Sequence, residues 1–185
     1  MTDALRPYRQ LARNAHLANL RLYRAVATLK PEEWDCARSG CFPSLRAAMN
    51  HIYTVDRFYI DALLGGSLGY AAFDSEEFFA EPEALAAAQT RLDLTLVAFT
   101  EGLKPQDLAR AVNIHRVNRI QTDTVANTLL HLLTHDQNHR GQILCLLAGT
   151  SIKPPRLDDF FMADDSCFRR ADLATAGWTE ADIQR

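Results

Sequence analysis

The sequence lacks several features that would have assigned it to a class of protein at once. No run of about 18 apolar residues occurs, so no segment has the character of a membrane-spanning helix. The first residues do not have the apolar core of a secretory signal peptide, and we therefore expect a cytoplasmic protein. The net charge is −3, which gives no electrostatic reason to expect binding to nucleic acid.

The four cysteines also lack a recognisable pattern. None forms C-x-x-C, and their spacing matches neither a zinc ribbon nor a disulfide framework. We interpret Cys145, which lies among leucines, as a packing residue. Cys36 and Cys41 fall in a connecting segment and could pair, although a reducing compartment argues against that disulfide.

Glycine and proline are scarce, with 8 and 7 residues among 185, which leaves room for long uninterrupted helices. Apolar residues recur at helical spacing in four segments, at about residues 4–29, 44–64, 83–100 and 124–148. Long connections separate them, including residues 66–82. The sequence therefore predicts an all-α fold, a four-helix bundle with long crossover connections. We expect residues 1–185 to form a single domain with a core at about 4–161 and a C-terminal tail at 162–185.

Residues 111–120 depart from the helical pattern. Val112 and Ile114 alternate with polar neighbours, which suggests a short β-hairpin before the last bundle helix. Thr122 or Asp123 would then cap that helix.

Two further expectations concern the ends of the chain. The arginines of the first helix are interpreted as a solvated helix face, which is the usual meaning of such spacing. Leu157, Phe160 and Phe161 should anchor the segment after the last bundle helix on the bundle.

The most informative segment is the last predicted bundle helix. Three of the six histidines, His131, His135 and His139, follow one another at intervals of four residues. Positions four apart lie on one face of a helix, and two imidazoles placed in this way can share one divalent cation. A single helix cannot complete such a site. The alternative is a polar helix edge without metal.

The remaining ligand has to come from another helix. His51 lies beside the apolar stripe of the second predicted helix, next to Ile52, which makes it the natural third ligand. Asp136 and Arg140 are the only charged residues from 124 to 148. Because they are four residues apart, we expect them to pair with each other, with Asp136 pointing away from the histidines.

Four sequence segments resemble the DinB-like proteins (the DinB/YfiT superfamily). The run from His135 to Ile143 resembles the terminal helix motif of that family, in which two histidines precede Arg-Gly-Gln, and residues 50–58 resemble its histidine-to-aspartate segment. Residues 12–19 and 154–158 fit as well, so the likeness covers about residues 8–161. Asn138 departs from the pattern, because many members have a second histidine next to the ligand.

The resemblance implies a DinB/YfiT-like four-helix bundle with a three-histidine metal site. Carried over by position, the metal ligands are His51, His135 and His139. The implied cofactor is a divalent transition metal, most often nickel or zinc, with iron an option. His131 would be a supporting or packing residue, His16 and His115 receive no role, and homodimers are expected.

Three neutral imidazoles leave one position of a tetrahedral ion open, which is the arrangement of catalytic sites. The resemblance therefore implies a metal-dependent enzyme, either a thiol S-transferase acting with a low-molecular-weight thiol or a hydrolase. No general base is evident, since Asp56 is off the face of His51. The alternative is a non-catalytic metal-binding or stress-response protein. Neither nucleic acid nor a membrane is expected as a partner.

Overall fold

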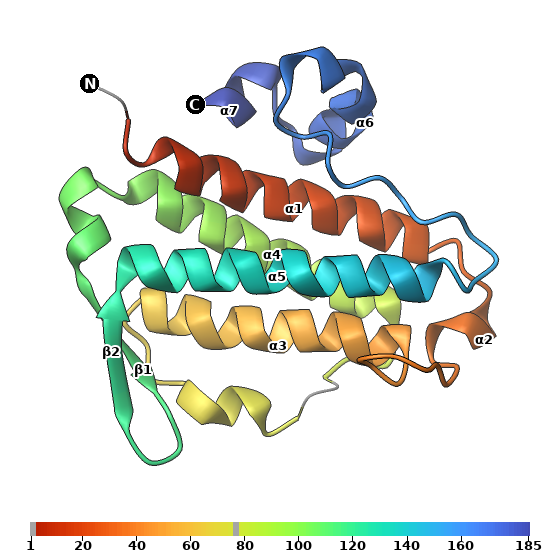
Figure 1. Cartoon of the computed structure of the whole chain (residues 1–185), viewed down its shortest axis with the longest axis horizontal. Coiled ribbons are helices and arrows are strands. Elements are labelled where there is room, and N and C mark those ends of the chain that lie inside the picture. Colours follow the sequence, from red (N-terminus) through yellow and green to blue (C-terminus); the bar gives the residue numbers. More distant parts are fainter. Residues whose placement is uncertain (1–2, 76–77) are drawn as a thin grey trace.

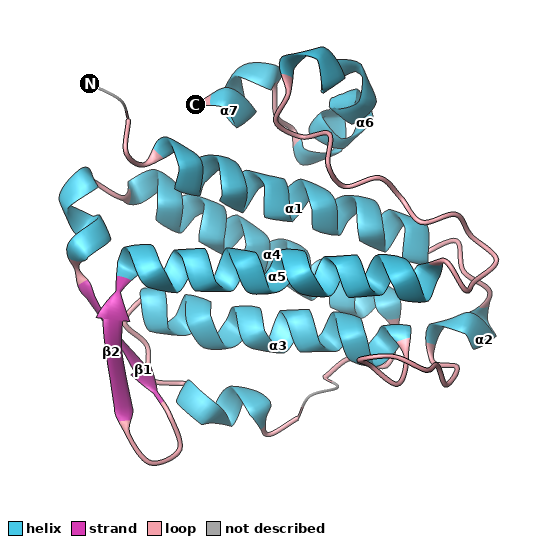
Figure 2. Ribbon diagram, viewed as in Figure 1, coloured by secondary structure: helices cyan, strands magenta, loops and turns pink. Residues whose placement is uncertain are grey.

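A computed structural model describes residues 3–75 and 78–185 (Figure 1). Four long helices form a bundle: α1 (Arg6–Val26), α3 (Leu45–Leu63), α4 (Pro82–Gly102) and α5 (Val125–Leu147). Helices α4 and α5 each pack against both α1 and α3, so that the four helices close around one core. The prediction of an all-α bundle with a short hairpin is confirmed (Figure 2).

Shorter elements occupy the connections. They are α2 (Pro31–Trp34), the 3-10 helices η1 (Gly69–Phe73), η2 (Pro105–Ala109) and η3 (Ala163–Asp165), and the C-terminal helices α6 (Ser166–Ala176) and α7 (Glu180–Gln184). Pro31 starts α2, because proline is compatible with a first helical turn. The indole of the buried Trp34 donates to the carbonyl of Ala80 at 2.7 Å, which ties this connection to the segment before α4.

Side-chain caps start the two helices that carry the candidate ligands. The Ser44 hydroxyl accepts from the Ala47 amide at 3.1 Å at the start of α3. At the start of α5 the Thr124 hydroxyl accepts from the Asn127 amide, also at 3.1 Å. The expected caps Thr122 and Asp123 were therefore wrong, because the preceding strand continues to Thr124.

The hairpin consists of β1 (Ala111–His115) and β2 (Ile120–Thr124), antiparallel, with His115 opposite Ile120. Val112 and Ile114 point into the core. Helical segment η1 packs against β1 at Gly69, which has a φ of +52° and where an added Cβ would lie 2.6 Å from the Cβ of His115. Only glycine allows this approach, which fixes the hairpin at one end of the bundle (Figure 1).

Of two packing predictions, the one for the tail was partly correct and the one for Cys145 was wrong. Leu157 and Phe160 are buried, as expected for anchors of the tail, whereas Phe161 is 41% exposed. Cys145 is exposed rather than packed, and all four cysteines are free thiols.

The arginines of α1 are not a solvated face, because several of them hold the C-terminal segment. Arg21 donates to Asp159 at 2.7 Å and to Asp172 at 3.0 Å, and Arg24 donates to Asp172 at 3.0 Å. The buried guanidinium of Arg13 pairs with Glu101 and donates to the carbonyl of Arg185 at 3.0 Å. Helices α6 and α7 therefore lie on α1 (Figure 1).

Within the described ranges, no helix has both the length and the apolar character needed to cross a membrane.

Candidate metal centre

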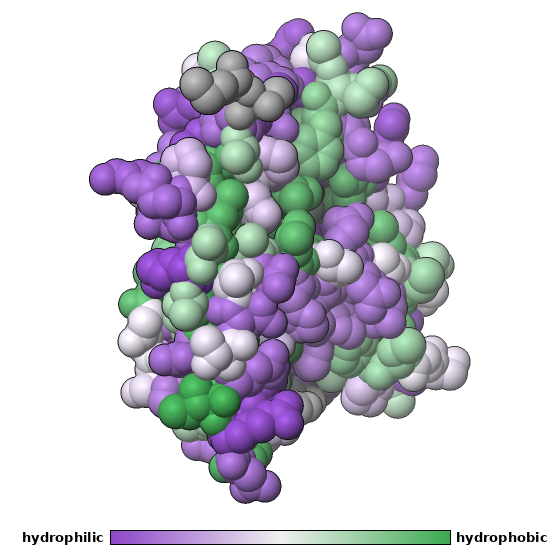
Figure 3. All heavy atoms as spheres, turned by 60° about the vertical axis from the view of Figure 1, so that its left-hand side comes forward, coloured by the Kyte–Doolittle hydropathy of each residue, from purple (hydrophilic) through white to green (hydrophobic). Residues whose placement is uncertain are grey.

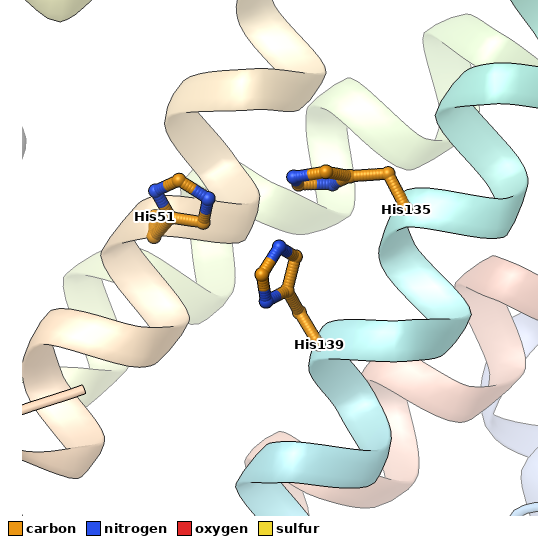
Figure 4. A group of neighbouring side chains, drawn as sticks. All are labelled: His51, His135 and His139. Carbon is orange, nitrogen blue, oxygen red and sulfur yellow. The ribbon is translucent and has the colours of Figure 1, made fainter. Parts of the chain in front are cut away.

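Helices α3 and α5 bring His51, His135 and His139 together (Figure 4). One nitrogen from each ring can be chosen so that all three nitrogens lie within 4.8 Å of one another. The ring centroids of His135 and His139 are 4.2 Å apart, and that of His51 is 4.8 Å from His139 and 5.4 Å from His135. Two ligands thus come from successive turns of α5, and the third comes from the neighbouring helix.

The three rings are half-buried, which affects their protonation. Burial, together with the neighbouring His139 and His135, lowers the pKa of His51 to about 4. Burial also lowers the pKa of His139. At neutral pH His51 and His139 are therefore uncharged, and neutral imidazole is the form that binds a metal.

A glutamine orients His139. The Nδ1 atom of His139 lies 2.7 Å from the side-chain oxygen of Gln142. An amide oxygen can only accept, so Nδ1 carries the proton and donates it to Gln142. The lone pair is then on Nε2, which is free to bind a cation.

A carboxylate faces the second histidine of α5. The Nδ1 atom of His135 is buried without a hydrogen-bond partner, and so is one oxygen of Asp136, and these two atoms are 3.6 Å apart. A shift of a few tenths of an ångström would close the hydrogen bond. The expected pair of Asp136 with Arg140 is present, although its distance of 3.9 Å is longer than the His135 contact. The expectation that Asp136 points away from the histidines is therefore wrong.

Asp136 belongs to a buried polar network in the middle of the bundle. Burial raises the pKa of Asp56, and the adjacent carboxylates of Asp136 and Asp93 raise it further, which favours the protonated form of Asp56. The amide of Gln89 donates to Asp56 at 2.5 Å and to Asp93 at 2.7 Å. Asp93 in turn contacts Nδ1 of His16 at 3.2 Å. His16 is thus a buried structural histidine.

The arrangement suits a divalent cation with three nitrogen ligands. Imidazole is a ligand that Zn, Ni, Cu and Fe accept, and metal-bound histidines usually donate their other N–H to an oxygen. His139 does so to Gln142, and His135 faces Asp136 in the same way. Within the part of the chain that the structure describes, no Cys, Asp or Glu joins the cluster as a fourth ligand.

The loop before α3 forms one wall of the site. The Phe42 ring lies 5.2 Å from that of His51 and 5.3 Å from that of His139. Beyond Phe42, a cavity of about 250 Å³ is lined by Cys41, Cys145 and Gln142, among others. Gln142 also donates to the Cys41 sulfur at 3.4 Å.

A groove of about 570 Å³ belongs to a different surface. It lies between α1, α5 and the segment after α5, and its lining includes Leu133, Asn138, Leu157 and Phe161 but none of the three clustered histidines. Asn138, which departs from the family pattern, therefore faces away from the cluster.

The other histidines fall outside the cluster. His131 lies next to the cluster: its ring centroid is 6.4 Å from that of His135 and 5.0 Å from that of Tyr59. His115 lies in the hairpin against Gly69. Sequence reasoning missed Phe42 and the role of Gln142. For Gln142 the spacing of three residues from His139 on one helix was an available signal.

The helical bundle and its three converging histidines can be compared with known protein families. A family model described as the DinB family matches residues 1–166, which is most of the chain. The chain belongs to the DinB family. Among curated proteins it is similar to Protein DinB of Bacillus subtilis (strain 168), with 25% identity over 145 residues, which cover 74% of this chain and 83% of that protein.

Proposed function

We propose that the protein binds one divalent transition metal, nickel or zinc, through His51, His135 and His139, and uses it to activate a thiol for S-transfer. The observation that supports this most is the cluster of three imidazole nitrogens within 4.8 Å of one another. A metal held by three imidazoles retains an open position and can lower the pKa of a thiol that binds there.

The residues of the chain have separate roles in this proposal. His135 and His139 present one nitrogen each, because Asp136 and Gln142 face the other nitrogen of each ring. Phe42 covers His51 and His139 and excludes water from that side. The half-buried rings leave the other side accessible.

Thiol chemistry fits this site better than hydrolysis. Metal-dependent hydrolases commonly place a carboxylate where it can move a proton of the attacking water, as in H-E-x-x-H enzymes. The described residues place no Asp or Glu in the histidine cluster, and Asp136 faces the Nδ1 side of His135. A thiol that binds as thiolate needs no such base during attack.

The first test is metal analysis of protein purified without an affinity tag. We expect about one metal per chain, strongly reduced occupancy in single alanine variants of the three histidines, and unchanged occupancy in His115→Ala. Full occupancy in the double variant His135→Ala, His139→Ala would exclude the site.

The second test concerns the chemistry. Cobalt-substituted protein should show a visible spectrum that shifts when a thiol such as glutathione is added, and S-transfer to an electrophile should disappear in His51→Ala. Ester or amide hydrolysis with a pH midpoint near 7 would support a hydrolase instead. A cobalt spectrum that does not change when thiols or small anions are added would identify a non-catalytic metal-binding protein.

The homodimer remains a prediction. Light scattering should give a molecular mass of about twice 20.8 kDa.

A further inference from the structure

The histidine cluster continues toward the hairpin as a row of rings. From His135 the row passes to His131 at 6.4 Å and from there to Tyr59 at 5.0 Å. At its end is a cavity of about 110 Å³ between the hairpin and helices α3 and α5, lined by Tyr59, Ile114, Arg116, Gln121, Asp123, Asn127, Thr128 and His131. The candidate metal centre and this cavity therefore share one interhelical surface.

Arg116 brings a positive charge to the cavity in a fixed orientation. Its Nη2 donates to the Tyr59 hydroxyl at 3.1 Å, and its Nε donates to the side-chain oxygen of Gln121 at 3.2 Å. Its guanidinium also lies over the Phe58 ring, 5.0 Å from the centroid. Among the described residues, all of these partners are neutral. The guanidinium is thus held in place without a carboxylate that would cancel its charge.

The neighbouring charged and titratable groups do not compete for Arg116. One carboxylate oxygen of Asp123 accepts from the Thr124 amide and from the Asn127 side chain, both at 2.8 Å. The charge of Asp123 is therefore directed to the start of α5. Burial, His135 and Arg116 lower the pKa of His131, which keeps this imidazole neutral and able to donate a hydrogen bond.

Arg116 can also be reached from outside. A second, more open cavity of about 420 Å³ lies against it at the hairpin tip and is lined by Tyr70, Arg119 and Gln121, among others. Figure 3 turns the hairpin side of the molecule toward the viewer and shows a largely hydrophilic surface with separate hydrophobic patches.

We infer that Arg116 binds a carboxylate on the thiol substrate, so that the substrate is an elongated acidic thiol. This inference rests on the proposed thiol chemistry. The Gln121 and Tyr59 contacts use Nε and one hydrogen of Nη2, and they hold the guanidinium in position. Nη1 and the second hydrogen of Nη2 remain as donors for a carboxylate. Tyr59 follows His51 by eight residues on α3, a distance of about 12 Å along the helix. A thiol bound at the metal with its carboxylate at Arg116 therefore needs a chain of several atoms between the two groups.

The test compares matched thiols on the cobalt-substituted full-length protein. The probes are 6-mercaptohexanoate, the neutral 6-mercaptohexanol of similar length, and 3-mercaptopropionate, which is too short to span the distance. The acid of six carbons should bind about 10-fold or more tightly than the alcohol, as expected for a charge-assisted hydrogen bond. The short acid should show no advantage over the alcohol.

Arg116→Gln should reduce the preference for the long acid to about 1, and Arg116→Lys should retain part of it. Arg110→Gln removes the same charge from an exposed arginine just before the hairpin, outside the lining of both cavities, and should leave the preference unchanged. Circular dichroism melting shows whether each variant is folded. Equal binding of acid and alcohol to the unaltered protein, or equal loss in the Arg116 and Arg110 variants, would overturn the inference.

A second measurement separates this inference from the proposed thiol function. Hexanoate, which has no thiol, is titrated into metal-free protein while the Nε resonance of Arg116 is followed by NMR. A saturable shift that Arg110→Gln retains, together with a cobalt spectrum that ignores thiols, would support the anion site and refute the thiol function. No shift of the Arg116 resonance at millimolar hexanoate would refute the anion site, whatever the cobalt spectrum does.

Discussion

At the scale of single residues, the candidate site depends on which nitrogen each imidazole presents. Gln142 settles this for His139, and Asp136 faces Nδ1 of His135. Gln142 is neutral, whereas Asp136 carries a carboxyl group that is almost fully buried beside two others, those of Asp56 and Asp93. Burying a negative charge among carboxyl groups is unfavourable. A divalent cation at the histidines would offset part of that negative charge.

We expect Asp136→Asn to weaken metal binding about 10- to 100-fold, the usual effect of losing an oxygen that supports a metal-bound histidine. Competition with a chromophoric chelator measures the affinity. Asp93→Asn, which alters a buried carboxylate away from His135, serves as the control and should leave the affinity nearly unchanged. Equal affinities of the unaltered protein and Asp136→Asn would show that His135 does not use this carboxylate.

The depressed pKa of His51 predicts a pH dependence of the metal-free protein. The ring has a pKa of about 4 in the folded chain and an ordinary value of 6.5. Between these values the unfolded chain binds more protons, so the free energy of unfolding decreases as the pH falls from about 6.5 to 4. Solvent screens a half-exposed ring, which leaves an effect on the order of 1–2 kcal/mol. Urea titrations at several pH values should show a smaller decrease in His51→Gln, and an identical decrease would contradict the assignment to His51.

At the scale of elements, the position of the hairpin determines which side chains lie beside α3 and α5 at that end of the bundle. Helical segment η1 and strand β1 approach closely only because residue 69 is glycine. The same hairpin carries Arg116 to Tyr59. The contact at Gly69 therefore helps to hold Arg116 at the cavity where we propose that the substrate carboxylate binds.

Gly69→Ala should destabilise the protein by about 2–4 kcal/mol, because the residue has a positive φ and its new Cβ would overlap His115. The melting temperature should fall by roughly 5–10 °C. In Gly102→Ala, where an added Cβ meets nothing within 4 Å, it should not fall. Calorimetry of both variants checks the prediction, and similar melting temperatures would show that η1 and β1 can separate at little cost.

At the scale of the whole molecule, the C-terminal segment packs on the bundle through the arginines of α1. The side chains of Asp159 and Asp172 are almost fully buried, and both accept from Arg21. Arg21 also lies over the Phe160 ring, 4.4 Å from its centroid. The same guanidinium also donates to the carbonyls of Arg156 and Phe168, at 2.6 and 3.3 Å, so Arg21 connects α1 to several residues of the C-terminal segment.

Arg21→Met should loosen this segment, because it leaves two buried carboxylates without their main partner. Breaking such a pair costs about 3–5 kcal/mol. Hydrogen exchange should accelerate in α6 while α3 and α5 stay protected. Arg156→Gln removes an exposed arginine whose pair with Asp158 contributes little, and it should leave exchange unchanged. Uniform acceleration in every helix would mean that the segment does not open separately.

Much of the fold was predictable because it depends on local rules. The apolar period defined the four bundle helices, and the alternation at residues 111–120 indicated the hairpin. Capping was less predictable, since Thr122, Asp123 and Thr124 all have side chains that can cap a helix. The length of strand β2 decided among them.

The sequence by itself determined that His135 and His139 share a helix face, because the geometry of an α-helix places residues four apart side by side. Only the tertiary structure decided the rest. His51 joins the cluster because α3 packs against α5. Arg116 reaches Tyr59 because the hairpin folds against α3. These contacts join residues distant in sequence, and their partners are chosen by helix packing rather than by spacing along the chain.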